Sequence, residues 1–202
     1  MKPNQFKGTP QKNREDGFTL IEVMIAIVVM SVGILSLVAV FGVAIAHTQS
    51  AEEDLIARQK VLEAMESIYT ARNSQQLPFS SVANVADGGI FQSGAQTLKC
   101  AGADGLVNTQ DDAPCTNQYS QVCPDGGAEC MVLPGNDGIL GTADDVTMSL
   151  GNFTRTVAIT TVQLPNGNTN QDMKAISITV SYTKAGLPAR SFTANGLISR
   201  YH

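Results

Sequence analysis

The stretch "GFTLIEVMIAIVVM", residues 17–30, contains a single charged residue, Glu22, in an otherwise apolar run. The chain then carries no charged residue from Val23 to Ala46. At roughly 1.5 Å per residue, a helix over that range would be about 36 Å long. The hydrocarbon core of a bilayer is about 30 Å thick. The run therefore predicts a membrane-spanning helix with a carboxylate at its N-terminal edge.

The charges of this acidic chain are unevenly distributed. The net charge is −5, but residues 1–17 carry +2, so the remainder carries −7. The basic residues of this first segment are Lys2, Lys7, Lys12 and Arg14, against Glu15 and Asp16. Basic residues before a membrane span favour a cytoplasmic N-terminus, which places the acidic part on the other side. We do not expect nucleic-acid binding, because phosphate contacts need clustered Lys and Arg.

Four cysteines follow the apolar run, at positions 100, 115, 123 and 130. An even number of closely spaced cysteines beyond a membrane predicts disulfides in an oxidising compartment. Zinc is the competing interpretation, but the chain has no CxxC pair, and its two histidines, His47 and His202, lie far from the cysteines. Three pairings are possible. We favour Cys100–Cys115 and Cys123–Cys130, because these pairs close the shorter loops.

The apolar run is longer than the core of a secretory signal peptide and has no clear cleavage site after it. A simple membrane anchor would leave Glu22 unexplained. A charge in the bilayer core costs roughly 2.5–3.5 kcal/mol and normally has a partner. No basic residue follows within several helical turns. The partner must therefore be another chain, the lipid surface or an amine at a newly made N-terminus.

The segment "GFTLIEVMIA" resembles the processing site of type IV prepilins and of type II secretion pseudopilins. The resemblance lies in Gly17, Phe18, the three residues Thr19–Ile21 and Glu22. It implies that a membrane-embedded prepilin peptidase removes residues 1–17 as a leader and methylates the new amine of Phe18. It also implies that Glu22 pairs with the Phe18 amine of a neighbouring subunit. One departure is the acidic pair Glu15-Asp16, since this family often has a basic residue before the glycine.

We expect residues 18–46 to form the transmembrane or filament-core part of a long helix that continues to about residue 72. Leu55, Leu62, Met65 and Tyr69 recur near helical spacing and predict an apolar stripe. Residues 47–202 would form the globular domain, with a Cys- and Asp-rich loop over 78–152 and an antiparallel meander over 153–202. The meander is predicted from alternating segments such as "KAISITVSYT", residues 174–183. This α+β class, a long N-terminal helix packed on a C-terminal sheet, is similar to the pilin fold.

The predicted loop contains an internal repeat. "DGLVNTQDD" (104–112) and "DGILGTADD" (137–145) align without gaps. Calcium takes about 6–8 oxygen ligands from carboxylates and carbonyls. The second copy also resembles the calcium loop of the major type II pseudopilins. The alternative is a pair of Asx-type turns that use aspartate for backbone hydrogen bonds. The candidate calcium ligands are Asp137, Asp144 and Asp145 in the second copy, and Asp104, Asp111 and Asp112 in the first.

We predict that the chain is not an enzyme, since it has no recognisable catalytic arrangement and no phosphate-binding loop. The C-terminal pattern "FTRTV" (153–157) followed by "KAISITVSYTKAG" (174–186) resembles minor pilins of the type IV pilus modification class and minor pseudopilins of type II secretion. The resemblance implies a minor pilin that is assembled into a pilus or primes one. The alternatives are a minor pseudopilin of type II secretion and a membrane-anchored calcium-binding module that never polymerises. Implied partners are other pilins or pseudopilins, the peptidase, the inner-membrane assembly platform and lipid. The implied location is the inner membrane, by a single span, then a periplasmic or extracellular filament.

Overall fold

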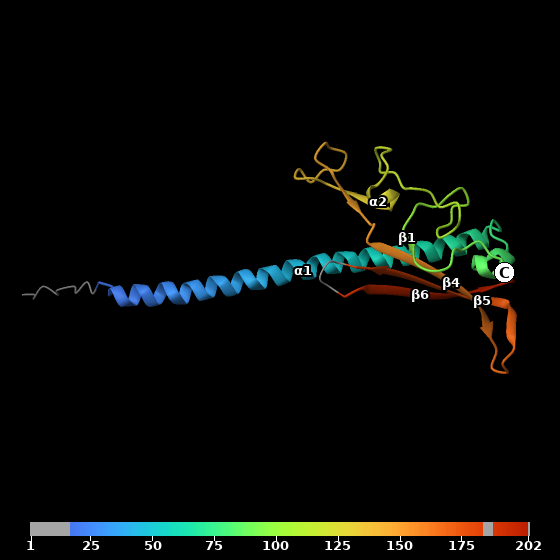
Figure 1. Ribbon diagram of the computed structural model, residues 1–202, viewed down its shortest axis with the longest axis horizontal. Helices are drawn as coiled ribbons and strands as arrows, with labels where there is room; N and C mark the ends of the chain where they lie inside the picture. The colour runs from blue at the N-terminus through green and yellow to red at the C-terminus, as the bar shows by residue number, and fades with distance from the viewer. Residues whose placement is uncertain (1–16, 184–187, 202) are drawn as a thin grey trace, which may run out of the picture. The chain divides into compact units, whose positions relative to one another are not determined.

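The computed structural model describes residues 17–183 and 188–201 and divides the chain into two compact units, Met1–Gln49 and Ser50–His202. Helix α1, Leu20–Asn73, runs through both units (Figure 1). In the first unit it is the only regular element among the described residues. In the second unit it supplies the helix of a domain that otherwise consists of strands, short turns and loops.

The second unit contains a four-stranded antiparallel sheet. Its order is β1-β4-β5-β6. The central pair is β4, Phe153–Gln163, and β5, Thr169–Tyr182, whose register shifts between Thr161 and Val162. The edge strands are β1, Gln96–Thr97, and β6, Arg190–Ser199. The predicted α+β class, with a long N-terminal helix and a C-terminal antiparallel sheet, is confirmed.

The alternation in β5 explains which face of the sheet is buried. Ile176, Ile178, Val180 and Tyr182 lie in the core, while the residues between them are only partly buried. This is the period of two that a half-buried strand requires. The predicted extent of this strand was too short, because β5 begins at Thr169, directly after the turn at Gly167.

The apolar stripe of α1 in the second unit differs from the predicted one. Leu55 and Leu62 are 65% and 62% exposed, so their assignment to the core was wrong. The stripe consists mainly of small residues at alternating spacings of four and three, which are Ala57, Val61, Ala64, Ile68 and Ala71. Small side chains let the helix lie close to the sheet. At Gly196 a Cβ would collide with the Tyr69 hydroxyl.

The segment predicted to be a loop, 78–152, contains several short elements. Two are 3-10 turns, η1 (Phe79–Ser81) and η2 (Val85–Asp87), and one is the single-turn α2 (Pro124–Gly127). The missed feature is an antiparallel hairpin of β2, Cys130–Leu133, with β3, Val146–Ser149. Its four-residue strands are too short for a clear periodic signal. The loop between them contains the second copy of the internal repeat.

The four cysteines form two disulfides, Cys100–Cys115 and Cys123–Cys130. This is the neighbour pairing. The first disulfide encloses the first copy of the repeat, and backbone hydrogen bonds between Cys100 and Ala113 close the same loop. The second disulfide ends at the first residue of β2. Both repeat copies are therefore anchored near their bases by covalent cross-links.

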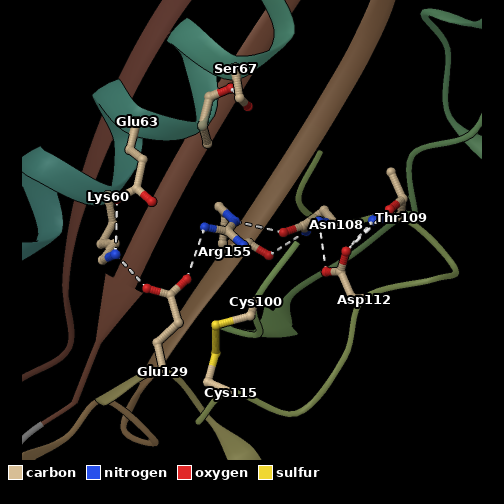
Figure 2. A network of polar contacts seen from close by, with 11 residues as sticks. Lys60, Glu63, Ser67, Cys100, Asn108, Thr109, Asp112, Cys115, Glu129 and Arg155 are labelled. Atoms are coloured by element: carbon tan, nitrogen blue, oxygen red, sulfur yellow. Dashed lines mark hydrogen bonds and ion pairs between the residues drawn. A yellow bond between two sulfur atoms is a disulfide. The ribbon is translucent and has the colours of Figure 1, made fainter. Parts of the chain in front are cut away.

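A buried polar network ties the cysteine-rich segment to α1 and β4 (Figure 2). Glu129 is only 8% exposed and lies between two cations. One of its oxygens pairs with Lys60 of α1, and the other lies 3.6 Å from Arg155 of β4. Arg155 is 1% exposed and donates its Nε–H to Asn108 Oδ1 at 2.7 Å. A buried charge needs such partners, because water is excluded.

The pKa directions in this network follow from burial and pairing. Burial lowers the pKa of Arg155, although the attraction of Glu129 opposes the effect. Burial also tends to lower the pKa of Lys60, but hydrogen bonds and attraction from Glu129 and Glu63 raise it overall. Glu129 is therefore the common counter-charge of a helix cation and a strand cation.

We expect Glu129→Ala to destabilise the second unit by about 3–5 kcal/mol, because it leaves two buried cations without their shared partner. Glu63→Ala is the matched control. The Glu63 side chain is 53% exposed, and its ion pair with Lys60 should contribute at most about 1 kcal/mol. Urea unfolding of the full-length chain in detergent, followed by near-UV circular dichroism, measures both changes. Equal losses in the two variants would contradict the role of Glu129.

Candidate functional site

The N-terminal edge of α1 is defined by Thr19. The carbonyl oxygen of Thr19 accepts the N–H of Glu22 at 3.1 Å and that of Val23 at 3.2 Å. The Thr19 hydroxyl oxygen also lies 3.4 Å from the Glu22 nitrogen, the position of an N-terminal cap. Gly17 and Phe18 precede the helix and are exposed, Phe18 by 83%. The Gly17–Phe18 peptide bond is therefore accessible and lies outside regular structure.

Glu22 occupies the third position of the helix, in its first turn. Its carboxylate has no hydrogen bond or ion pair within residues 17–183 and 188–201. The helix dipole favours an acid in this turn by typically 0.3–1 kcal/mol. That is less than the roughly 2.5–3.5 kcal/mol cost of a charge in the bilayer core. The helix end alone would therefore not offset burial of this charge in the bilayer core, where Glu22 would need a counter-charge from outside the helix.

The first part of α1 exposes apolar side chains on every side. Its large apolar residues are all about half exposed or more, from Val23 at 47% to Leu20 at 82%. The helix is long and apolar enough to cross a membrane, and none of its most apolar window is buried within the chain. A helix that is apolar all round belongs in lipid or among other helices. Its polar side chains Ser31, Ser36 and Thr48 donate to carbonyls of the same helix.

The first repeat copy folds as a turn held by its own aspartates. Asp104 Oδ1 accepts the N–H of Leu106 at 2.8 Å, and Asp111 Oδ2 accepts the N–H of Asp104 at 3.2 Å. Thr109 donates its hydroxyl to Asp111 Oδ1 at 2.7 Å. These are the contacts of an Asx-type turn closed by a second aspartate.

The second copy repeats these three contacts at the same distances. Asp137 Oδ1 accepts from Ile139 at 2.8 Å, Asp144 Oδ2 accepts from Asp137 at 3.2 Å, and Thr142 donates to Asp144 Oδ1 at 2.7 Å. Sequence similarity over nine residues therefore corresponds to one backbone structure that is built twice. The Asx-turn interpretation accounts for these contacts without a metal.

The structural repeat begins two residues before the sequence match. A Cβ on Gly102 would collide with the carbonyl oxygen of Asp111, and a Cβ on Gly135 would collide with that of Asp144. Glycine is required because the two ends of each turn approach closely. The signal in the sequence was a Gly-x-Asp at the start of both copies, which the aligned stretch did not include.

The aspartates that close the turns are stabilised as carboxylates. The pKa of Asp111 lies below its usual value, first because Thr109 donates a hydrogen bond and then because backbone N–H groups do so. The pKa of Asp144 is lowered by the corresponding donors, with Thr142 the largest contributor. Both carboxylates are charged at neutral pH and already have donors.

The copies differ at the last aspartate. Asp112 Oδ1 accepts the N–H of Thr109 at 3.2 Å and its hydroxyl at 3.1 Å. In the second copy, Asp145 Oδ2 accepts from Gly141 and Tyr119, but Asp145 Oδ1 is buried and has no hydrogen-bond partner. No group of three or more His, Cys, Asp or Glu side chains suited to a metal occurs in the described part of the chain. Calcium binding stays a prediction, and Asp145 Oδ1 favours the second copy.

Comparison with known proteins identifies the N-terminal segment. Residues 12–38 match the family model of the prokaryotic N-terminal methylation motif. The match includes Gly17, Phe18, Glu22 and the first part of the apolar helix; residues 12–16 lie outside the described residues. No curated protein and no solved structure matches the chain. The match therefore concerns the N-terminal segment and does not extend into the second unit.

The calcium prediction has a discriminating test in the last aspartates of the two copies. If calcium satisfies Asp145 Oδ1, the full-length chain in detergent should melt several degrees higher in millimolar calcium than in chelator. Asp145→Asn should abolish that difference. Asp112→Asn, whose carboxylate is already fully bonded, should preserve it. Coincident melting curves of the wild-type chain in calcium and in chelator, with disulfides intact, would assign both copies to plain aspartate turns.

Proposed function

We propose that this chain, which its N-terminal methylation motif indicates to be a type IV prepilin-like protein, is a minor subunit of a pilus filament. Prepilin peptidase removes residues 1–17, and the new amine of Phe18 is methylated. The processed chain is held in the inner membrane by a single span with its N-terminus at the cytoplasmic face. An assembly platform in that membrane then transfers it into the filament, where it joins or primes the growing polymer.

The observation that carries this proposal is the carboxylate of Glu22 at the start of an apolar helix, which has no hydrogen bond or ion pair among the residues that the structure describes. Cleavage after Gly17 creates an ammonium group four residues before it, which is about one helical turn. A cation in low dielectric is the partner that this carboxylate needs. A pair formed between two subunits gives each charge its counter-charge and fixes the axial register of one chain against the next.

The exposed apolar surface of the helix supports the same function. Within the membrane, lipid covers this surface; within a filament, the helices of neighbouring subunits would cover it. Both environments suit a helix that is apolar on all sides. A minor pseudopilin of type II secretion would use the same N-terminal segment, since the two systems resemble each other there. Recovery of the processed chain in sheared extracellular filaments would favour the pilus.

The first prediction of this proposal concerns processing. The mature chain should begin at Phe18 and carry a methyl group on its amine, because the Gly17–Phe18 bond is accessible beside the apolar helix. N-terminal mass spectrometry of protein extracted from membranes measures this directly. A Gly17→Val variant should retain residues 1–17. A wild-type chain that still begins at Met1 in cells with active peptidase would favour the non-polymerising anchored module.

The second prediction concerns Glu22. Glu22→Ala should insert into the membrane normally, because loss of a charge lowers the insertion cost. Its incorporation into filaments should fall at least about tenfold, which corresponds to a pair worth about 1.4 kcal/mol or more. Glu52→Ala, an exposed position of the same helix in the second unit, is the control. Immunoblots of membrane and sheared filament fractions give both quantities. Unchanged filament levels in the Glu22 variant would exclude the pairing role.

A further inference from the structure

The two edges of the four-stranded sheet differ in how their backbone groups are used. On the β4 edge, the Asn84 side chain accepts the N–H of Ile159 at 2.9 Å and donates to the carbonyl oxygen of Val157 at 2.8 Å. The Asn108 side chain donates to the carbonyl oxygen of Arg155 at 3.0 Å, and β1 pairs with the beginning of the same strand. The second half of β4 contains the register shift. The β4 edge is therefore closed first by side chains and a short strand, and then interrupted by an irregularity.

The backbone groups of the other edge strand, β6, can be assigned from the register of the sheet. In an antiparallel pair, the backbone groups of successive residues point alternately toward and away from the neighbouring strand. Val157 points away from β5, so its partner Ile178 points toward β6, and the partner of Ile178, Ala194, points toward β5. The residues of β6 that point away from the sheet are then the alternate ones, Ser191, Thr193 and Asn195. We call the backbone of these three residues the open edge.

The open edge has no partner and no protection within the described part of the chain. No hydrogen bond among the described residues uses its outward N–H and C=O groups. Edge strands are usually protected by proline, lysine or a bulge, because such groups recruit another strand. Strand β6 contains neither Pro nor Lys, and it pairs with β5 without a register shift. Helix α1 closes only the next outward position, where Tyr69 donates its hydroxyl to the carbonyl oxygen of Leu197 at 3.0 Å.

We propose that the open edge binds an extended segment of a different subunit of the same assembly, which adds a fifth strand to the sheet. The inference rests on the proposed function, because it needs a neighbouring subunit beside this chain. An extended peptide backbone is the ligand that fits, since its donors and acceptors repeat at the spacing of alternate strand residues, roughly 6.7 Å. The open edge offers room for a segment of about five residues before Tyr69 ends it.

The helix beside the open edge indicates the side chains of the bound segment. Arg58 of α1 lies 4.4 Å from the centroid of the Phe192 ring of β6, and Tyr69 contacts Leu197 further along. Leu62 comes one helical turn after Arg58, on the same side of α1, and is 62% exposed. An added strand beside β6 would cover this side chain. We therefore expect the bound segment to carry an apolar residue on the side that faces α1.

A second copy of this chain is a poorer occupant than a different subunit. Copies cannot extend one sheet from chain to chain, because that needs two open edges and the β4 edge is closed. Two β6 edges that pair around a two-fold axis across the sheet run antiparallel. Helix α1 runs in the same direction as β6, since Arg58 contacts Phe192 and Tyr69 contacts Leu197. Such a pair would oppose the two helices, whereas chains inserted in one membrane with the same orientation keep them parallel.

The experiment uses the full-length chain in cells that assemble filaments, with a photo-crosslinking amino acid at position 195. Mass spectrometry of the product should join position 195 to another protein that carries an N-terminal methylation motif. A probe at Ala158 is the matched control. It is exposed on the same face and in the same row of the sheet, through the registers Ala158↔Ser177 and Ser177↔Asn195, but it lies two strands away from the open edge. It should give none of this product.

Two variants of one residue test whether the contact uses the backbone. Thr193→Pro removes an outward N–H and leaves the ladder with β5 intact, because that N–H points away from β5. It should lower the crosslink yield at least about tenfold. Thr193→Val loses the same hydroxyl, which lies 2.8 Å from that of Thr179, but it keeps the N–H. Its yield should stay within about twofold of wild type, and equal yields in the two variants would overturn backbone pairing.

Hydrogen exchange of the unmodified chain tests the same edge without a variant. In detergent, the amides of Thr193 and Asn195 should exchange faster than that of Ala194, which bonds to β5. In isolated filaments their exchange should slow at least about tenfold. Slow exchange of both amides in the detergent-solubilised chain would overturn the open edge. Fast exchange of both in filaments that contain the processed chain would overturn the added strand.

The outcomes separate this inference from the proposed function. Processed chain in the filament fraction without a crosslink from position 195 overturns the added strand and leaves the function intact. A crosslink that joins position 195 to a second copy of this chain overturns the assignment of the partner. The expected crosslink in membranes, without any chain in filaments, supports the added strand while the filament role fails.

Discussion

The second unit depends on one carboxylate between two cations. Glu129 connects Lys60, on the helix, with Arg155, on the central strand β4, and it does so from a segment with little regular structure. The hydrophobic effect alone would position this segment poorly, because it is rich in Gly, Asp and Pro. Buried charges supply the missing specificity, since each has few positions in which it is satisfied. The Cys100–Cys115 disulfide lies beside the network and restricts the same segment (Figure 2).

A second carboxylate, Glu22, differs from Glu129 in where its counter-charge can lie. Glu129 finds both of its cations inside its own domain, whereas Glu22 has no partner among the described residues of its chain. The same physical rule applies to both, because a charge away from water needs a counter-charge. The two carboxylates therefore differ in whether the counter-charge belongs to the same unit of the chain. The globular unit supplies both cations of Glu129, although Asp145 Oδ1 in the same unit is buried without a hydrogen-bond partner, and the helix that carries Glu22 requires either water or another molecule.

The fold was largely predictable where the sequence is periodic. The apolar helix, the alternating residues of β5 and the order of helix before sheet follow from spacing. Glu22 stood out as a charge in an apolar run, whereas Gly17 and Phe18 were assigned from the resemblance to the prepilin processing site. The prediction of the buried face of α1 failed because that face is distinguished by the small size of its side chains rather than by their polarity. Leu55 and Leu62 suggested the buried stripe, but the small residues Ala57 and Ala64 occupy it, because close helix–sheet packing selects for small side chains. The network around Arg155 also lacked a signal, since its partners are separated by up to 95 positions in the sequence.

The internal repeat shows why a local motif and its environment must be considered separately. Hydrogen bonds within nine residues determine the turn, so both copies adopt it. The burial of the apolar pair depends instead on contacts with residues outside the turn. Asn108 is an example: in the first copy its side chain bonds both the Nε–H and the carbonyl oxygen of Arg155, whereas the second copy has Gly141 at that position. Loss of that side chain removes the polar attachment to the sheet and leaves the turn intact. Two apolar residues, Ile139 and Leu140, are then exposed on a turn that is held by its own hydrogen bonds.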